Sequence, residues 1–174
     1  KYANIYETDA DDIQEARKSF LELRQGLVEA GRMSDLGKTV AWGIFPRIGS
    51  TATAAAGKPV RGLLINSLNC KDPSREEEFS DWYSNVHIPD ILASGFFHSA
   101  YRYENADPGN VYSLATPVSG VLGKYINIYE TDLDPVDASN GIRGERAKWE
   151  ARGHTNDLGE IKIRLLVRPV YPKS

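Results

Sequence analysis

The sequence is poor in the residues that build covalent and metal-bound scaffolds. Its 174 residues include a single cysteine, Cys70, and three histidines. A lone thiol excludes an intrachain disulfide framework and a cysteine-based zinc site, and it fits a reducing compartment. No recognised spacing makes a metal triad from His87, His98 and His154, so a dedicated metal site is not expected. Cys70 is interpreted as a small residue at a strand end rather than a nucleophile, because no activating base stands near it.

Positive charge and long apolar runs are also scarce. The net charge is −3 and no Lys/Arg stripe offsets it, so nucleic acid is not an expected partner. No apolar run approaches the length of a membrane span, and the N-terminus has no basic region followed by an apolar core. We therefore expect a cytoplasmic protein without a membrane partner. No glycine-rich loop joins a strand to a helix, which argues against a nucleotide cofactor.

The chain contains an internal repeat. Residues 2–11 read YANIYETDAD and residues 125–134 read YINIYETDLD, and the likeness returns between GRMSDLG at 31–37 and GHTNDLG at 153–159. Such self-similarity indicates a duplicated unit. The first copy is predicted to be β-α-β only, with strands at 2–7 and 39–45. Its helix would be capped by Asp11 or Asp12 and ended by Gly31.

The repeat predicts an incomplete unit followed by a complete one. Residues 1–48 correspond to the second half of a unit, residues 49–60 form a Ser/Thr/Ala/Gly-rich linker, and residues 61–172 form a full unit. Because the chain starts inside a strand and without methionine, we expect a processed or shortened form. The full unit has strands at 61–68, 97–104, 125–130 and 161–168, helices at 75–88 and between Asp134–Pro135 and Gly153, and a long loop at 105–123.

This β-α-β-β-α-β order is typical of the split βαβ, ferredoxin-like arrangement, an α+β fold with two helices on one face of an antiparallel sheet. Its first helix is amphipathic, with an apolar stripe at i, i+3, i+4 and i+7 formed by Phe79, Trp82, Tyr83 and Val86. Trp82 is expected to lie buried between this helix and the sheet.

His87 follows the stripe by one turn and is the best candidate for acid/base chemistry. Pro89 lacks a backbone donor and disfavours helical geometry before it, so the helix is predicted to break just after His87. The helix dipole and Asp90 would both favour the protonated imidazole. Asp90 could orient the imidazole, and the alternative is a solvated capping carboxylate.

The residues Phe79, Trp82, Tyr83, His87 and Pro89 fill a pattern close to F-x-x-W-Y-x-x-x-H-x-P. This pattern resembles the EthD-like family of dimeric α+β barrel proteins, and the similarity spans about residues 61–170. The resemblance implies two ferredoxin-like sheets packed face to face, here as a tandem pseudo-dimer, with a pocket between sheet and helix. It also implies a role in small-molecule metabolism. Related proteins include cofactor-free monooxygenases, lactone isomerases, and cyclases or decarboxylases of aromatic polyketides.

Alternation along the strands predicts polar, aromatic faces. Tyr125, Asn127 and Tyr129 point away from Ile126 and Ile128, and they were expected to face the second sheet and line a cavity for an oxygenated aromatic ring. The same holds for residues 2, 4 and 6 of the first copy. The alternative is that these tyrosines only fill a core between the sheets. The candidate substrate-binding residues are Tyr83, Tyr101, Tyr103, Tyr125, Asn127 and Tyr129.

The sequence therefore predicts a small-molecule enzyme that needs no cofactor and no metal. His87 would move a proton while a pocket tyrosine donates to the developing oxyanion. Decarboxylation, dehydration, cyclisation and isomerisation of an oxygenated aromatic, polyketide-like or lactone substrate all stay open. So do a cofactor-free monooxygenase, a non-catalytic ligand-binding or accessory protein, and a structural oligomer with a filled interior. Pairing of two copies through the barrel edges is a further expectation.

Overall fold

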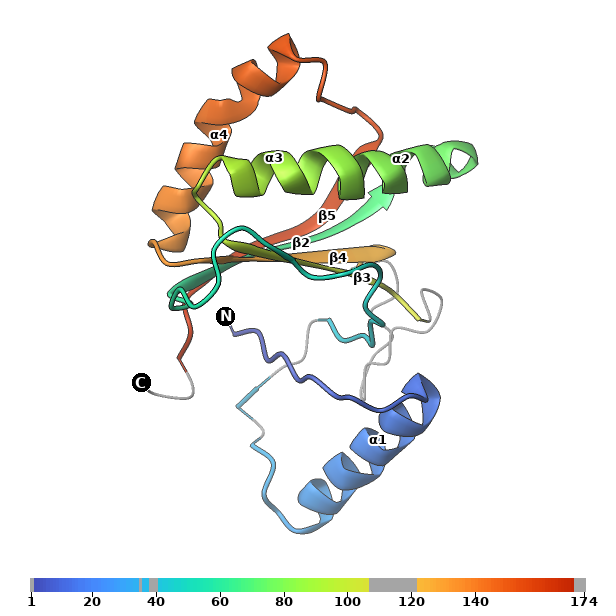
Figure 1. Cartoon of the computed structure of the whole chain (residues 1–174). Helices are drawn as coiled ribbons and strands as arrows, with labels where there is room; N and C mark the ends of the chain where they lie inside the picture. Colours follow the sequence, from blue (N-terminus) through green and yellow to red (C-terminus); the bar gives the residue numbers. More distant parts are fainter. Residues whose placement is uncertain (1, 35, 38–40, 107–121, 171–174) are drawn as a thin grey trace.

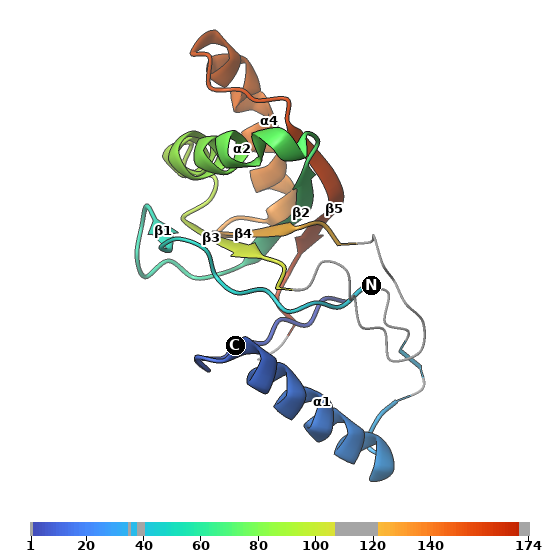
Figure 2. The same ribbon diagram turned by 90° about the vertical axis from the view of Figure 1, so that its right-hand side faces the viewer.

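The computed structural model describes residues 2–34, 36–37, 41–106 and 122–170. They form one antiparallel sheet with α2, α3 and α4 on one face, while α1 lies on the other side (Figures 1 and 2). The elements are α1 (Ile13–Glu29), β1 (Ala52–Thr53), β2 (Gly62–Cys70), the 3-10 turn η1 (Pro73–Arg75), α2 (Glu76–Trp82), the π-helical turn η2 (Tyr83–His87), α3 (Ile88–Ala93), β3 (Ser99–Glu104), β4 (Tyr125–Thr131), α4 (Pro135–Ala151) and β5 (Gly159–Val167). Among the described helices, none is both long and apolar enough to cross a membrane.

The strand order confirms the predicted fold class. The sheet runs β1-β3-β4-β2-β5, and every neighbouring pair is antiparallel. Without the short edge strand β1, this is the order in which β4 inserts between the two parallel strands of a split βαβ unit. All four strands predicted for the full unit are present. The fold is therefore α+β and ferredoxin-like, as the element order indicated.

The two long helices begin and end where the repeat predicts. Asp12 caps α1 through its side chain, and Asp134 caps α4 in the same way. Each helix is followed by a glycine in the left-handed region, Gly31 with φ 65° and Gly153 with φ 70°. Because a side chain strains this conformation, glycine is the natural terminator. The two helices therefore start and end with the same local signals, an aspartate cap and a left-handed glycine.

The strands predicted in the first copy do not form. Residues 2–7 have no strand partner. Residues 41–45 form no strand either, although the carbonyl of Ile44 accepts a bond from Ala106 just beyond β3, and residues 38–40 lie outside the described part of the chain. Alternation suits a strand, but a strand also needs a neighbour for its backbone groups. Tyr2 and Tyr6 are 88% and 74% exposed, and α1 buries none of its residues. The described residues contain one sheet, so the second sheet of a pseudo-dimer has no counterpart there.

The segment predicted as a linker contributes to the sheet. Residues 52–53 form β1, which pairs with β3. Further backbone bonds continue along the same edge: Ile48 donates to Arg102 and Glu104 donates to Pro46. Most of the long loop, residues 107–121, lies outside the described residues. The edge of the sheet at β3 is therefore covered by the chain that precedes the full unit.

The helix that carries the histidine motif does not break after His87. It runs from α2 through η2 into α3, and the N–H of Ile88 bonds to the carbonyl of Tyr83, five residues back. Pro89 cannot donate, and in a regular α-helix its ring would clash with the carbonyl four residues before it. A π-helical turn inserts the extra residue that relieves this conflict. The prediction of a break was wrong because the helix widens instead.

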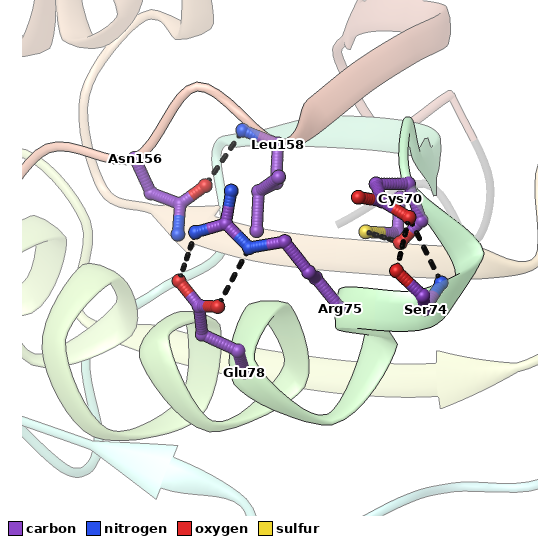
Figure 3. A network of polar contacts seen from close by, with 7 residues as sticks. Cys70, Ser74, Arg75, Glu78, Asn156 and Leu158 are labelled. Carbon is purple, nitrogen blue, oxygen red and sulfur yellow. Dashed lines mark hydrogen bonds and ion pairs between the residues drawn. The ribbon is translucent and has the colours of Figure 1, made fainter.

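The start of α2 is fixed by a small polar network (Figure 3). Asp72 accepts bonds from the backbone and hydroxyl of Ser74, and Arg75 grips Glu78 with Nε and Nη2. Cys70 is buried and its Sγ contacts the carbonyl of Asp72 at 3.1 Å. The cysteine therefore sits at a strand end in a structural position.

Trp82 lies elsewhere than expected. It is half-buried and packs against the rings of Phe79 and His87, and its Nε1 donates to the carbonyl of His154 at 3.1 Å. It therefore ties the motif helix to the connection between α4 and β5 rather than filling the space above the sheet.

Replacing Trp82 tests this role. We expect Trp82→Ala to lower the free energy of unfolding by about 2–4 kcal/mol, because ring contacts and the indole bond are both lost. Trp82→Phe keeps the ring packing and should cost about 1 kcal/mol, the scale of one hydrogen bond. Urea unfolding measures both values. No loss in the Trp82→Phe variant would show that the indole bond to His154 contributes nothing, and equal losses in the two variants would show that the ring packing contributes nothing.

Candidate functional site

A polar row crosses the sheet beneath the motif helix. The strand register places Arg102 of β3 opposite Asn127 of β4, Asn127 opposite Asn66 of β2, and Asn66 opposite Arg164 of β5. Arg102, Asn127 and Asn66 are at most 6% exposed, whereas Arg164 is exposed and donates to Ser139 of α4. A core layer normally holds apolar side chains at such positions. This row is the most unusual feature of the buried interior.

Tyr125, Asn127 and Tyr129 share the face of the row and lie under the helices. Tyr125 packs against Phe79 of α2, and Tyr129 bonds to Tyr83. The expectation that this face meets a second sheet was therefore wrong. Alternation separates the two faces of a strand but does not say which face the helices cover.

Tyr83 and Tyr129 form a buried hydroxyl pair. The Tyr129 hydroxyl donates to that of Tyr83 at 3.0 Å. Burial raises the pKa of Tyr83, and hydrogen bonds from Tyr129 and Asn66 offset part of the rise; burial also holds the pKa of Tyr129 well above its usual range. Both phenols are therefore neutral at ordinary pH. Because Tyr83 accepts from its neighbours, its own proton is available for another acceptor.

The imidazole of His87 packs edge-on against Tyr83. Their ring centroids are 4.7 Å apart, Trp82 stacks at 4.8 Å, and Trp149 of α4 lies at 6.1 Å. Burial lowers the pKa of His87 to about 4; the charge of Asp90 opposes this shift and that of Arg164 adds to it. The expectation of a protonated imidazole was wrong, because desolvation outweighs the nearby carboxylate. His87 is a neutral base.

Asp90 has other partners. Its carboxylate lies 2.8 Å from Nδ1 of His154 and 3.6 Å from Nη1 of Arg152. It influences His87 through its charge, but the structure gives no hydrogen bond between them. The proposed orienting contact is therefore replaced by a link between α3 and the end of α4.

Tyr101 and Tyr103 lie on the opposite face of the sheet. They alternate with Arg102 along β3, and the guanidinium of Arg47 lies 5.2 and 5.7 Å from their ring centres. Tyr101 also donates to Glu130. The six tyrosine and asparagine candidates thus divide between two faces. The structure brings together Tyr83, Tyr125, Asn127 and Tyr129, and it leaves the other two apart.

Sequence reasoning missed Arg102 and Asn66. The available signal was the two-residue period of a strand: Arg102 is two residues from Ala100, so both side chains lie on the same face of the sheet. A charged side chain on a strand face with buried neighbours would have identified the row.

Among the described residues, no three His, Cys, Asp or Glu side chains gather as a metal site would require.

Comparison with known proteins gives two partial likenesses. Over 95 residues the chain is 30% identical to core atranone cluster (CAC) protein 1 of Stachybotrys chlorohalonatus, an alignment that covers 53% of this chain and 41% of that protein. The chain thus spans less than half the length of this relative. The crystal structure of HapK from Hahella chejuensis superposes with a TM-score of 0.42 and 9% identity, over 65% of this chain and 96% of that one. No family model matches the chain.

The buried state of His87 makes stability depend on pH. Its pKa is about 4 in the folded chain, against about 6.5 when unfolded. Between these values the unfolded chain binds a proton that the folded chain does not, so stability falls as pH falls from about 6.5 to about 4. His87 is half-buried in the folded chain, so part of this effect is screened by solvent. We expect His87→Gln to remove on the order of 2 kcal/mol of the fall. Urea titrations of both proteins across this range would contradict the assignment if the two profiles ran parallel.

Proposed function

We propose that the chain is an EthD-like enzyme that carries out cofactor-free acid/base chemistry on an oxygenated aromatic, polyketide-like or lactone substrate. The observation that carries the proposal is the contact between the neutral imidazole of His87 and the buried phenol of Tyr83. The Tyr83 hydroxyl accepts a hydrogen bond from Tyr129, so its own proton is left for a substrate oxygen. One group can accept a proton and the other can donate a hydrogen bond. The name of the atranone cluster relative supports a setting in secondary metabolism.

His87 would act as the general base. A neutral imidazole takes a proton from a substrate C–H or O–H group that lies next to a carbonyl. A general base is most effective when its pKa lies near the working pH. The negative charge that develops on the substrate would raise the pKa of His87 from its low resting value. The substrate itself therefore prepares the base for the second half of the reaction, in which the imidazolium returns the proton.

Tyr83 would stabilise the enolate or phenolate oxygen that proton removal creates. Its hydroxyl is held by Tyr129 and lies in a buried environment, where a fixed donor is worth more than in water. The guanidinium of Arg102 lies 5.1 Å from the Tyr83 ring centre and adds positive charge on the same side. Proton removal and oxyanion stabilisation are common to isomerisation, dehydration and cyclisation. The imidazolium then returns the proton to another substrate carbon in isomerisation, to the leaving hydroxyl, which departs as water, in dehydration, and to the new alkoxide in an aldol-type cyclisation. Decarboxylation needs the same oxyanion stabilisation and the return step.

A non-catalytic ligand-binding protein is the second candidate. The observation that favours it is the pairing of Asp90 with His154, which leaves His87 without the carboxylate that commonly orients a catalytic imidazole. Such a protein would bind the same ligands without turning them over.

A matched pair of variants decides between these functions. Once a substrate is found by screening aromatic polyketides, lactones and β-keto acids, His87→Gln should bind it and lower turnover by roughly a hundredfold or more, the scale of a lost general base. His98→Gln is the control, because His98 is buried against Ser99 instead of Tyr83. Its turnover should stay near that of the parent protein.

Several results would reject the proposed chemistry. Full activity in the His87→Gln variant would exclude His87 as the proton carrier. Loss of activity after dialysis against a chelator would exclude the metal-free mechanism, and oxygen consumption during turnover would favour a monooxygenase. Ligand binding without turnover across the whole screen would favour the binding protein.

A further inference from the structure

Arg102 is a buried cation in which two of the three side-chain nitrogens have no hydrogen-bond partner among the described residues. Arg102 is 5% exposed. Nη1 donates to the carbonyl and hydroxyl of Ser80 and to the hydroxyl of Ser84, all on the motif helix. Nε and Nη2 have no hydrogen-bond partner within the described part of the chain. A buried guanidinium in this state is costly unless something pairs with it.

Two carboxylates on this side of the sheet pair with Lys124. Its Nζ lies 3.3 Å from Glu104, two residues along β3, and 3.4 Å from Oε1 of Glu76, at the start of α2. Oε1 of Glu76 is itself buried and has no hydrogen-bond partner among the described residues. The rings of Tyr83 and Tyr125 lie 5.1 and 4.7 Å from the guanidinium carbon of Arg102. Such ring contacts satisfy the flat faces of a guanidinium and leave its N–H edge free.

The free edge has a definite shape. Nε–H and one Nη2–H of an arginine point the same way and match the two oxygens of a carboxylate. The chain uses this edge elsewhere: Arg75 donates from Nε to one oxygen of Glu78 at 2.8 Å and from Nη2 to the other at 2.5 Å (Figure 3). Arg102 presents the same pair of donors in the interior, without the carboxylate.

Unpaired amides stand next to this edge. Both the Oδ1 and the Nδ2 of Asn127 are buried without a partner among the described residues, and so is Oδ1 of Asn66. The register puts Asn127 directly opposite Arg102 and Asn66 directly opposite Asn127. Three neighbouring strands thus present unsatisfied polar atoms in one line. An amide that can both donate and accept suits a hydroxyl or carbonyl oxygen.

We propose that Arg102 binds the carboxylate of the substrate and that Asn127 binds an oxygen on the β carbon, two bonds from the carboxyl carbon. The ligand class is then a β-oxo acid or an ortho-hydroxy aromatic acid. This inference rests on the proposed function for its location, because Tyr83 lies in contact with both Arg102 and His87. It narrows the substrate from an oxygenated ring to an organic anion.

The arrangement also explains why a polar row persists in the core. Replacing buried ionic groups by apolar residues is often neutral or stabilising, so stability alone does not favour a row of this kind. The unpaired atoms acquire partners when a carboxylate and its adjacent oxygen enter. The competing account is that ordered water fills these positions and no ligand does.

Binding measurements with salicylate as the probe test the carboxylate site. Isothermal titration of the whole chain should show salicylate binding more tightly than salicylamide, its neutral counterpart. Arg102→Gln should weaken salicylate binding at least tenfold and leave salicylamide binding unchanged. Arg102→Lys should restore only part of the loss, because an ammonium cannot grip both oxygens. Arg75→Gln is the matched control, since it removes the same kind of fork at the surface.

The second contact is tested with benzoate, which lacks the ortho hydroxyl. Asn127→Leu should weaken salicylate binding and leave benzoate binding unchanged. If circular dichroism shows that Arg102→Gln is unfolded, the Arg102→Lys variant replaces it. The ratio of its salicylate affinity to its salicylamide affinity should then be lower than that of the parent protein. Equal affinity of the parent protein for both probes, or equal loss of both in the variants, would overturn the proposal and favour water in the row.

The outcome for the carboxylate site is independent of the outcome for catalysis. A chain that binds salicylate through Arg102 but shows no His87-dependent turnover keeps the carboxylate site and loses the proposed enzyme function. A chain that turns over neutral lactones through His87 but does not prefer salicylate keeps the function and loses the carboxylate site.

Discussion

The candidate site depends on one backbone constraint, the proline inside the motif helix. Pro89 has no N–H and would clash with a carbonyl in a regular α-helix, yet the helix continues for a further turn in α3. The widened turn η2 resolves this conflict, and the rings of Tyr83 and His87 at its two ends lie in contact. π-helical turns are frequent at functional sites. The residues of the proposed chemistry therefore lie on the turn that accommodates the proline.

The sheet contributes the opposite requirement. A core of this size gains its stability from apolar burial, and Leu64, Phe79 and Phe97 supply it. The row from Arg102 to Asn66 removes several positions from that core and leaves polar atoms without partners. Proteins tolerate such losses where a ligand or water completes the network, and functional sites are where local rules of folding are most often broken. The same row that weakens the core is where we propose that the substrate carboxylate binds.

In this interior the nearest charge does not decide the protonation state of His87. Asp90 is close enough to raise the pKa of His87, yet burial and Arg164 prevail and the imidazole stays neutral. Arg102 is equally affected, since burial lowers the pKa of its guanidinium. The site thus combines a neutral base, two neutral phenols and a guanidinium whose Nε and Nη2 have no hydrogen-bond partner among the described residues. An anionic substrate would change all of these at once, and this couples recognition to the activation of the base.

Part of the local structure follows from the sequence alone. Asp12, Asp134, Gly31 and Gly153 set the ends of α1 and α4, and the alternation in 125–131 set β4, because caps and periodicity act over a few residues. The element order also predicted the ferredoxin-like topology, and the motif made Tyr83 and His87 candidate site residues. Tertiary structure decided the rest. Which face of β4 the helices cover, which strands lie beside residues 2–7, and whether desolvation or Asp90 governs His87 all depend on contacts between distant segments. The polar row exists only through the register of separate strands, a relation that no local pattern encodes.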